Sequence, residues 1–287
     1  MRNDSLGSAP VPTFRARSAA EYSWDTLADI YNHTRLDYIV PMPMNGRRMA
    51  DYVQAYQVDL AASLVVHDDD ENPLGIGMLG LRDSRCWITR LGVSPEGRGR
   101  GLGTFLMHAL LDQGRMRGAA LAQLEVIQGN LPALQLFQKL DFKPSRELLV
   151  LRRPPGPPET PDAACVSLEQ DAIERCLIER DAVAPSWLDE SCSLLRLGSL
   201  MGFALHDAPN NWLVCHTGAF QLTHVCIGAD SPEHAIRLLS HLHTQFPRFD
   251  TKLENLPTYS PLLPAFWTLG YYNEFSRLEM LLPLPIP

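Results

Sequence analysis

The chain has 287 residues, of which 45% are hydrophobic and 20% are charged, a composition typical of soluble globular proteins rather than of disordered ones. A chain of this length usually forms two domains. Its formal net charge of −8 argues against the basic face that binds a nucleic-acid backbone, so we expect no nucleic-acid partner.

The first residues, MRNDSLGSAPVP, lack the apolar core of a secretory signal, and no apolar stretch is long enough to span a bilayer. We therefore expect a cytoplasmic protein with no membrane partner. No CxxC pair occurs, which favours reduced thiols that pack in the interior. The cysteines are Cys86, Cys165, Cys176, Cys192, Cys215 and Cys226.

Taken in chain order, the first part of the sequence predicts an α/β arrangement with a mixed sheet. A helix begins at residues 23–31, where Trp24, Leu27, Ile30 and Tyr31 share one face. The expected strands are 13–16, 63–67, 74–81, 86–93, 121–127 and 142–152. The acidic run at 68–73 reads as a turn whose carboxylates are solvated, and we expect no metal site.

Two further helices are predicted between the later strands. Leucines at helical spacing predict a helix over 102–116, and Gly118 stands where such a helix would stop. Asn130 is a good N-cap for the second helix, and Pro132 lies in its first turn, where a missing N–H costs least. This helix is expected to end near Asp141.

The loop SPEGRGRGLG at 94–103 joins a predicted strand to a predicted helix. A helix start exposes unpaired N–H groups and about half a positive charge, and glycine lets the backbone approach a ligand closely. With Arg98 and Arg100 the loop could cradle a pyrophosphate. A P-loop is disfavoured because no glycine in the loop precedes a lysine. A Rossmann motif is disfavoured because Thr104 stands where its third glycine belongs.

Residues 98–103 match the R/Q-x-x-G-x-G/A signature of the GNAT N-acetyltransferase superfamily. The flanking blocks 91–95 (LGVSP) and 130–142 also resemble that family, and the likeness covers about residues 13–152. The resemblance implies acetyl-CoA as the acyl-donor substrate. The residues it implies at the cofactor are Leu91, Gly92, Val93, Arg98, Gly99, Arg100, Gly101, Leu102, Gly103, Thr104, Asn130 and Phe137.

Acetyl transfer to an amine requires a group that removes a proton from the amine. The main candidates for proton transfer are Glu125 on a predicted strand and Tyr38 in the first helix region, which the resemblance places beside the acceptor. Tyr31 and His33 of the same region, and His108 and Asp112 on the predicted helix 102–116, are further candidates. Many relatives carry a tyrosine that protonates the leaving thiolate, and Phe137 replaces it here. The family's glycine after this helix is Asp141, which a helix end tolerates at modest cost.

The proline-rich run 153–163 predicts a stiff linker between a domain at 1–152 and a domain at 164–287. The second domain repeats landmarks of the first: the Ser-Pro-Glu of 94–96 recurs at 231–233, within SPEH, and the Asn-Leu-Pro of 130–132 recurs at 255–257. We therefore expect two GNAT-like domains, each a mixed, mostly antiparallel sheet flanked by helices. The second loop, SPEHAIRLL, has no glycine, so a second cofactor site is not expected. His241 and His243 are two residues apart on a helix and make a poor metal pair.

The leading functional hypothesis is an acetyl-CoA-dependent N-acetyltransferase acting on a small amine, as a monomer or homodimer. A CoA-binding sensor that has lost catalysis is the alternative, because Phe137 has no proton to donate. A purely structural tandem scaffold is the third possibility.

Overall fold

The computed structural model describes residues 14–157, 162 and 164–285. Its contacts divide the chain into two compact units. The first comprises Met1–Ala50, Val58–Ala120 and Leu284–Pro287, and the second comprises Asp51–Gln57 and Leu121–Pro283. Residues 158–161 and 163 of the predicted linker lie outside the described residues. The domain boundary at 153–163 therefore stays a prediction.

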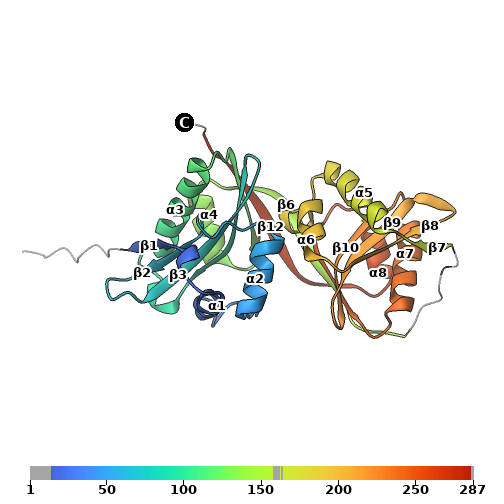
Figure 1. Ribbon diagram of the computed structural model, residues 1–287, viewed down its shortest axis with the longest axis horizontal. Helices are drawn as coiled ribbons and strands as arrows, with labels where there is room; N and C mark the ends of the chain where they lie inside the picture. The colour runs from blue at the N-terminus through green and yellow to red at the C-terminus, as the bar shows by residue number, and fades with distance from the viewer. Residues whose placement is uncertain (1–13, 158–161, 163, 286–287) are drawn as a thin grey trace, which may run out of the picture. The chain divides into compact units, whose positions relative to one another are not determined.

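The first unit contains a four-stranded antiparallel sheet in the order β1-β2-β3-β4. Its elements are β1 (Arg15–Ser18), α1 (Trp24–His33), the start of α2 (Gly46–Ala55), β2 (Leu64–His67), β3 (Pro73–Arg82), β4 (Arg85–Val93) and α3 (Leu102–Met116). Helix α3 packs on β3 (Figure 1), and it buries Leu102, Leu106 and Leu110. The loop before α3 is thereby fixed at the end of β4.

The second unit contains the remaining strands in the order β5-β12-β6-β11-β10-β9-β8-β7. Its strands are β5 (Leu121–Ile127), β6 (Lys143–Arg153), β7 (Cys165–Ser167), β8 (Leu200–Leu205), β9 (Ala208–Thr217), β10 (Gln221–Gly228), β11 (Asp250–Pro257) and β12 (Tyr272–Pro283). Its helices are α4 (Leu131–Lys139), α5 (Gln170–Arg180), α6 (Ser191–Leu197), α7 (Pro232–Gln245) and α8 (Leu263–Thr268).

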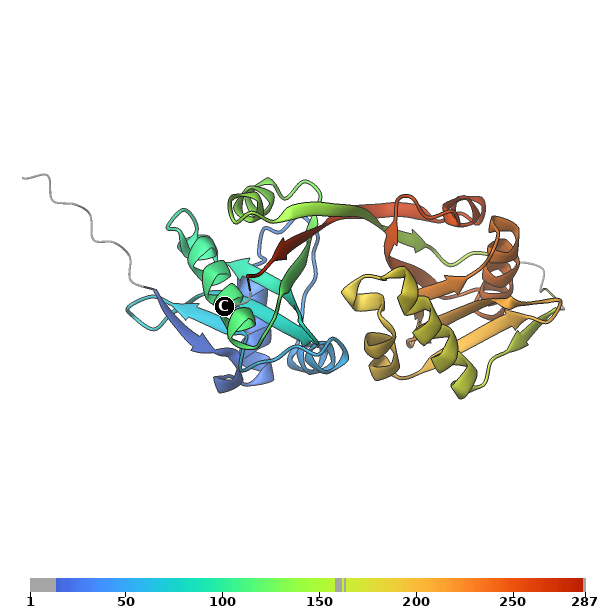
Figure 2. The same cartoon turned by 90° about the horizontal axis from the view of Figure 1, so that it is seen from above.

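The order of elements is the same in two successive stretches of chain. From β1 to β6 and again from β7 to β12, the chain runs strand, two helices, three strands, helix, strand, helix, strand. The last strand of each repeat pairs with the other repeat: β12 lies between β5 and β6, and β6 lies between β12 and β11. Figure 2 shows these two long strands side by side. The predicted internal repetition of an α/β layer is confirmed.

Most element boundaries follow the sequence prediction, and α3 and β5 occur over the predicted residues. The opening strand is Arg15–Ser18 instead of 13–16, and Thr13 lies outside the described residues. Helix α2 was not expected. Its sequence, GRRMADYVQA, is hydrophilic on average, and few of its side chains are buried, including Met49 and Ala55.

All six cysteines are free thiols, and Cys86, Cys215 and Cys226 are buried. Burial raises the pKa of the Cys86 thiol to about 11 and those of Cys215 and Cys226 to about 12. A thiol with such a pKa is almost entirely protonated at neutral pH and a poor nucleophile. These cysteines therefore pack as small apolar side chains, as the sequence predicts.

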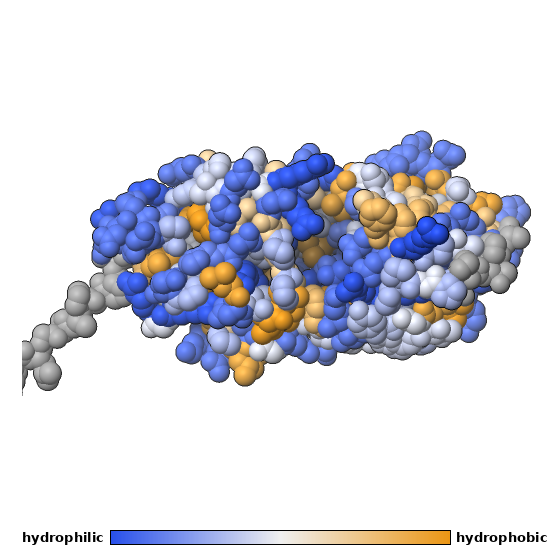
Figure 3. All heavy atoms as spheres, turned by 90° about the horizontal axis from the view of Figure 1, so that it is seen from below, coloured by the Kyte–Doolittle hydropathy of each residue, from blue (hydrophilic) through white to orange (hydrophobic). Residues whose placement is uncertain are grey.

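The face in Figure 3 is mostly hydrophilic, with apolar side chains in small separate patches. Large exposed apolar residues include Leu36, Met116 and Phe220. Scattered exposure of this kind is ordinary for a protein surface. None of the helices in the described part of the chain combines the length and apolarity that crossing a membrane requires.

Candidate functional site

The first feature of the candidate site is a β-bulge in β4. Ile76 of β3 pairs with Gly92 and Met78 pairs with Thr89, so one residue of β3 stands opposite Arg90 and Leu91. Arg90 has a φ of 50°, which is rare for a residue with a side chain. A bulge interrupts the ladder and redirects the strand. The end of β4 therefore has main-chain groups that β3 does not pair regularly.

The second feature is the loop between β4 and α3. Gly99 and Gly101 have φ values of 73° and 81°, a left-handed conformation that strains any other residue. No heavy atom lies within 4 Å of a Cβ placed on either glycine, so the space above the loop is open. Helix α3 begins after Gly101 with no side-chain cap. The first N–H groups of α3, from Leu102 to Thr104, can therefore face an anion.

The two arginines of the loop differ in their contacts. Arg98 donates both terminal nitrogens to the Asp37 carboxylate, at 2.5 and 2.7 Å, and its Nε to the Val93 carbonyl at 3.3 Å. This bond from Arg98 lowers the pKa of the Asp37 carboxyl. The Arg100 side chain is exposed, and its guanidinium lies 5.7 Å from the centre of the Phe14 ring. Arg98 therefore binds within the unit, whereas Arg100 extends into solvent.

The segment after α1 lies against the end of β4. A Cβ on Gly92 would come within 2.1 Å of the Thr34 hydroxyl, so the two segments touch. Arg35 donates to the carbonyl of Leu91 at 3.2 Å, at the bulge. The Arg35 guanidinium also stacks on the ring of Tyr38, 3.8 Å from its centre. Tyr38 is thus placed beside the strand end through Arg35.

Asn130 and Phe137 lie in the second unit and shape helix α4. Asn130 caps the helix, because its side-chain oxygen accepts a bond from the Ala133 N–H at 3.3 Å. Phe137 is 5% exposed, and its ring centre lies 6.0 Å from that of Phe142. The predicted N-cap role of Asn130 is confirmed, and Phe137 packs in the interior as an apolar side chain.

Glu125 is half-buried on β5, directly opposite Glu279 of β12. Directly opposite residues of an antiparallel pair project from the same face of the sheet. The Glu279 carboxylate accepts two bonds from Arg146, at 2.8 and 2.9 Å. The positive charge of Arg146 therefore offsets the repulsion between Glu125 and Glu279. The fold can thus accommodate the two acids side by side.

The helix start in the second repeat differs from that of α3. Ser231 caps α7 by accepting a bond from the His234 N–H at 3.3 Å. Pro232 occupies the first turn, and Glu233 places a negative charge there. A capped start with an adjacent acid disfavours an anion. The candidate anion site is accordingly found in the first repeat, at the uncapped start of α3.

In the second repeat, strands β10 and β11 pair in parallel only through Gln221 with Asp250 and Leu222 with Thr251. The short helix η4 (Trp187–Asp189) contacts β11 beyond those pairs. Trp187 is fully buried, and Ser186 accepts a bond from Asn255 of β11 at 2.9 Å. Protein side chains therefore fill the place where these strands part.

Sequence reasoning missed four features of the site region: helix α2, the bulge at Arg90, the Asp37–Arg98 pair, and the packing of η4. Arg90 carries no local signal because an arginine rarely adopts a positive φ. The Asp37–Arg98 pair and the packing of η4 depend on contacts between distant parts of the chain. The glycine pattern of 98–103, by contrast, identified the open loop directly.

Comparisons with known proteins agree with this geometry. Residues 24–142 match the family model described as the acetyltransferase (GNAT) family. The mycothiol acetyltransferase of Clavibacter michiganensis is 30% identical over 142 residues, which cover 48% of this chain and 45% of that protein. The chain thus spans less than half the length of this curated relative.

Two solved structures resemble nearly the whole chain. The GCN5-related N-acetyltransferase of Sphaerobacter thermophilus has a TM-score of 0.71 at 16% identity, and the match covers 94% of this chain and 95% of that one. A tandem GNAT protein from the clavulanic acid biosynthesis pathway has a TM-score of 0.65 at 15% identity, and the match covers 94% and 98%. At these identities the likeness shows the fold, and it includes both repeats.

Proposed function

We propose that the protein is an acetyl-CoA-dependent N-acetyltransferase acting on a small-molecule amine, and the premise is the match of residues 24–142 to the GNAT acetyltransferase family model. One observation carries the proposal: α3 begins uncapped behind two left-handed glycines, with open space above them. This arrangement suits the pyrophosphate of CoA, because main-chain N–H groups and the helix dipole favour an anion there.

The donor would lie along the end of β4 and the loop. In this proposal, main-chain groups of Leu91, Gly92 and Val93 bind the pantetheine arm. The amides of residues 98–104 hold the pyrophosphate, with Arg100 adding positive charge. Asn130 and Phe137 belong to the helix that the family places near the end of the arm.

The chemistry joins the amine nitrogen to the acetyl carbon and breaks the carbon–sulfur bond, which gives an amide and the CoA thiol. An alkylamine with a pKa of about 10 is mostly protonated at neutral pH, so a base must first remove a proton. Glu125 and Tyr38 are the candidate bases. A thiol with a pKa of about 8.5 gives a thiolate that leaves without a strong acid, so Phe137 is compatible with turnover.

The second repeat is proposed to bind no donor. Its helix start is capped by Ser231 and carries Glu233, and the place where β10 and β11 part is filled by Trp187 and its neighbours. The loop has no glycine to let a pyrophosphate approach the main chain. One acetyl-CoA should therefore bind per chain.

Calorimetry with acetyl-CoA and CoA, followed by a thiol-release assay over a panel of amines, tests the proposal. The panel should include amino sugars, amino acids, polyamines and the unacetylated precursor of mycothiol, since a curated relative is named for mycothiol. Binding of one CoA per chain with thiol release on at least one amine is the expected result. Tight binding without turnover on any amine favours the sensor alternative, for which the buried Phe137 is the motivating observation. Failure to bind CoA would refute both.

A further inference from the structure

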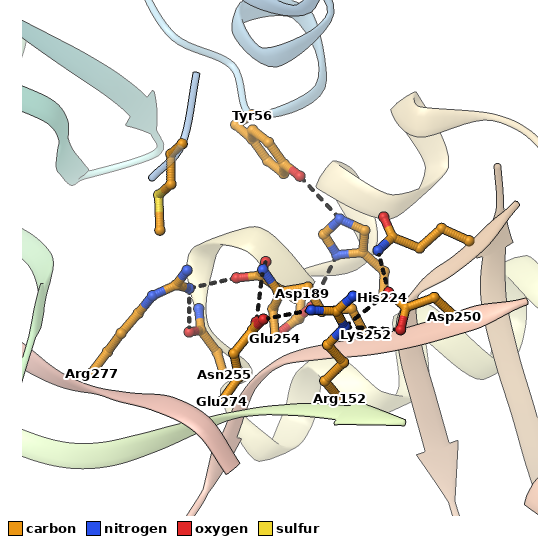
Figure 4. A network of polar contacts seen from close by, with 12 residues as sticks. Tyr56, Arg152, Asp189, His224, Asp250, Lys252, Glu254, Asn255, Glu274 and Arg277 are labelled. Carbon is orange, nitrogen blue, oxygen red and sulfur yellow. Dashed lines mark hydrogen bonds and ion pairs between the residues drawn. The ribbon is translucent and has the colours of Figure 1, made fainter. Parts of the chain in front are cut away.

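The end of helix α2 belongs by its contacts to the second unit, where Tyr56 is held at two atoms. Its hydroxyl lies 3.1 Å from Nε2 of His224, and its carbonyl accepts a bond from Trp187 Nε1 at 2.9 Å. Figure 4 shows the Tyr56 ring pointing toward His224. Tyr56 is 8% exposed and Trp187 is fully buried. The residue that directly follows α2 is therefore held in the interior of the second unit.

His224 is itself rigidly oriented. It stands at a β-bulge of β10 with a φ of 51°, the counterpart of Arg90 in β4. Its Nδ1 lies 3.3 Å from the Asp189 carboxylate, which also accepts a bond from Ser186 at 3.1 Å. A carboxylate accepts hydrogen bonds, so the tautomer of His224 that donates from Nδ1 to Asp189 lets Nε2 accept from the Tyr56 hydroxyl.

A network of charges supports these residues from the strand side (Figure 4). Asn255, which donates to Ser186, accepts a bond from Arg277 at 2.7 Å. Arg277 also pairs with Glu254 at 2.7 Å, and Lys252 lies 3.4 Å from the same carboxyl group. Burial raises the pKa of Glu254, but Arg277 and Lys252 outweigh it and lower the pKa to about 2. Glu254 is therefore ionised over the physiological pH range.

The opposite end of α2 is anchored in the first unit. Asn32 of α1 exchanges two bonds with the main chain of Met44, at 2.8 and 2.9 Å. A Cβ on Gly46 would come within 2.1 Å of the Asp25 carboxylate, so α2 starts against α1. The residues between α1 and α2 include Arg35, which binds Leu91 at the bulge. Segment 31–44 therefore lies between the end of β4 and the start of α2.

We propose that Ser186, Trp187, Asp189 and His224 form a socket for Tyr56, which positions α2 and, through it, segment 31–44 for acceptor binding. This inference rests on the proposed function, because it takes the end of β4 to be where the donor's thioester lies. Segment 31–44 contacts that strand end through Thr34 and Arg35, so it lies beside the place where the amine would meet the thioester. The second repeat thus serves acetyl transfer by holding one helix, and Tyr56, Trp187 and His224 are positioning residues.

Hydrogen–deuterium exchange tests the socket without any substrate. In Tyr56→Phe, the amides of residues 31–45 should exchange about 3- to 10-fold faster, because loss of the hydroxyl loosens α2. Tyr271→Phe is the matched control: its hydroxyl lies 3.1 Å from Nε2 of the buried His243, in the same unit but away from α2. It should leave residues 31–45 unchanged. Faster exchange confined to residues 51–57 and 186–190, or equal in the two variants, would overturn the proposal.

Kinetics with the panel amine that turns over fastest provides the second test. Tyr56→Phe and His224→Leu should raise the KM for this amine about 5- to 10-fold, with kcat and the Kd for CoA within about 2-fold of wild type. His224→Gln should restore much of the loss, because its amide oxygen can accept from Tyr56. An unchanged KM in both Tyr56→Phe and His224→Leu would contradict the positioning role. If no amine turns over, the proposed function fails, and the exchange experiment still decides whether the socket holds segment 31–44.

Discussion

Arg98 and Asp37 form a two-pronged ion pair that ties the loop before α3 to the segment after α1. Both terminal nitrogens of Arg98 contact the carboxylate, at 2.5 and 2.7 Å, and Nε donates to Val93. The planar guanidinium of Arg98, whose geometry would also suit a phosphate, is therefore bound to the Asp37 carboxylate. Both side chains are largely exposed, and exposed pairs stabilise a fold by about 0–1 kcal/mol, so an incoming pyrophosphate can compete for Arg98.

Replacing Asp37 by asparagine should therefore strengthen CoA binding. The change removes a negative charge beside the proposed pyrophosphate site and releases the Arg98 fork. We expect the Kd for CoA to fall about 2- to 5-fold at low salt, and the gain to shrink as ionic strength rises. Calorimetry at two salt concentrations measures both effects.

Asp112→Asn is the matched control for this change, because Asp112 is an exposed acid that pairs with Arg115 farther along the same helix. It should leave the Kd for CoA within error of wild type. Equal tightening in both variants would indicate a general effect of net charge. Weaker binding in Asp37→Asn would show that the ion pair preorganises the loop instead of competing with the ligand.

Gly101→Ala should weaken CoA binding as well as destabilise the fold. Alanine pays about 1–2 kcal/mol for a left-handed conformation, and its methyl group projects over the proposed pyrophosphate site. Gly118 offers a control at the other end of α3: its φ is also 81°, and no heavy atom lies within 4 Å of an added Cβ. We expect similar losses of unfolding free energy in denaturant for both variants.

Only Gly101→Ala should lose CoA affinity, by about 10-fold or more, if the amides of the loop bind the phosphates. The same affinity in both glycine variants would mean that the loop is not the donor site. In that case the structural-scaffold hypothesis would gain support.

The fold was largely predictable where local signals agree. Helix α3 combines leucines at helical spacing with glycines beyond both ends, and its predicted bounds were correct. The repeat was visible because Ser-Pro-Glu (94–96 and 231–233) and Asn-Leu-Pro (130–132 and 255–257) occur in the same order in both halves of the sequence. The exchange of β6 and β12 was not predictable, because each strand has the same apolar pattern whichever neighbour it pairs with.

The candidate site, like the fold, could be predicted from the sequence only where local signals exist. Alternating glycines between a predicted strand and a predicted helix indicate an open loop, so Gly99 and Gly101 could be identified from the sequence. Asp37 lies 61 residues before Arg98, and Tyr56 lies 168 residues before His224. No local pattern specifies such pairs, because tertiary packing decides which polar side chains meet.

Glu125 and Tyr38 should be separable as bases by their effects on kcat. If Glu125 removes the amine proton, Glu125→Gln should lower kcat about 10²- to 10⁴-fold with an unchanged Kd for acetyl-CoA, and Tyr38→Phe should change kcat little. The reverse pattern would assign the role to Tyr38. Glu147→Gln, a half-buried acid on β6, is the control for loss of a carboxyl group. Near-normal kcat in both variants would refute both assignments.

His243 should make the second unit sensitive to mild acid. It is fully buried with its Nε2 3.1 Å from the Tyr271 hydroxyl, and burial, with a smaller effect of Arg153, lowers its pKa from 6.5 to about 3. Because the unfolded chain takes up this proton below pH 6.5 and the folded chain does not, stability is complete above pH 6.5 and falls as the pH drops toward 3. The loss of unfolding free energy is about 1.4 kcal/mol per pH unit, or about 2 kcal/mol at pH 5.

Urea unfolding at pH 7.5 and 5.0 measures this loss. The unfolding free energy of the wild type should fall by about 2 kcal/mol more than that of His243→Gln, since glutamine keeps an acceptor for Tyr271 and does not titrate. The exposed His206→Gln serves as the control and should retain the wild-type drop. Parallel pH dependences in wild type and His243→Gln would show that His243 is protonated in the folded protein.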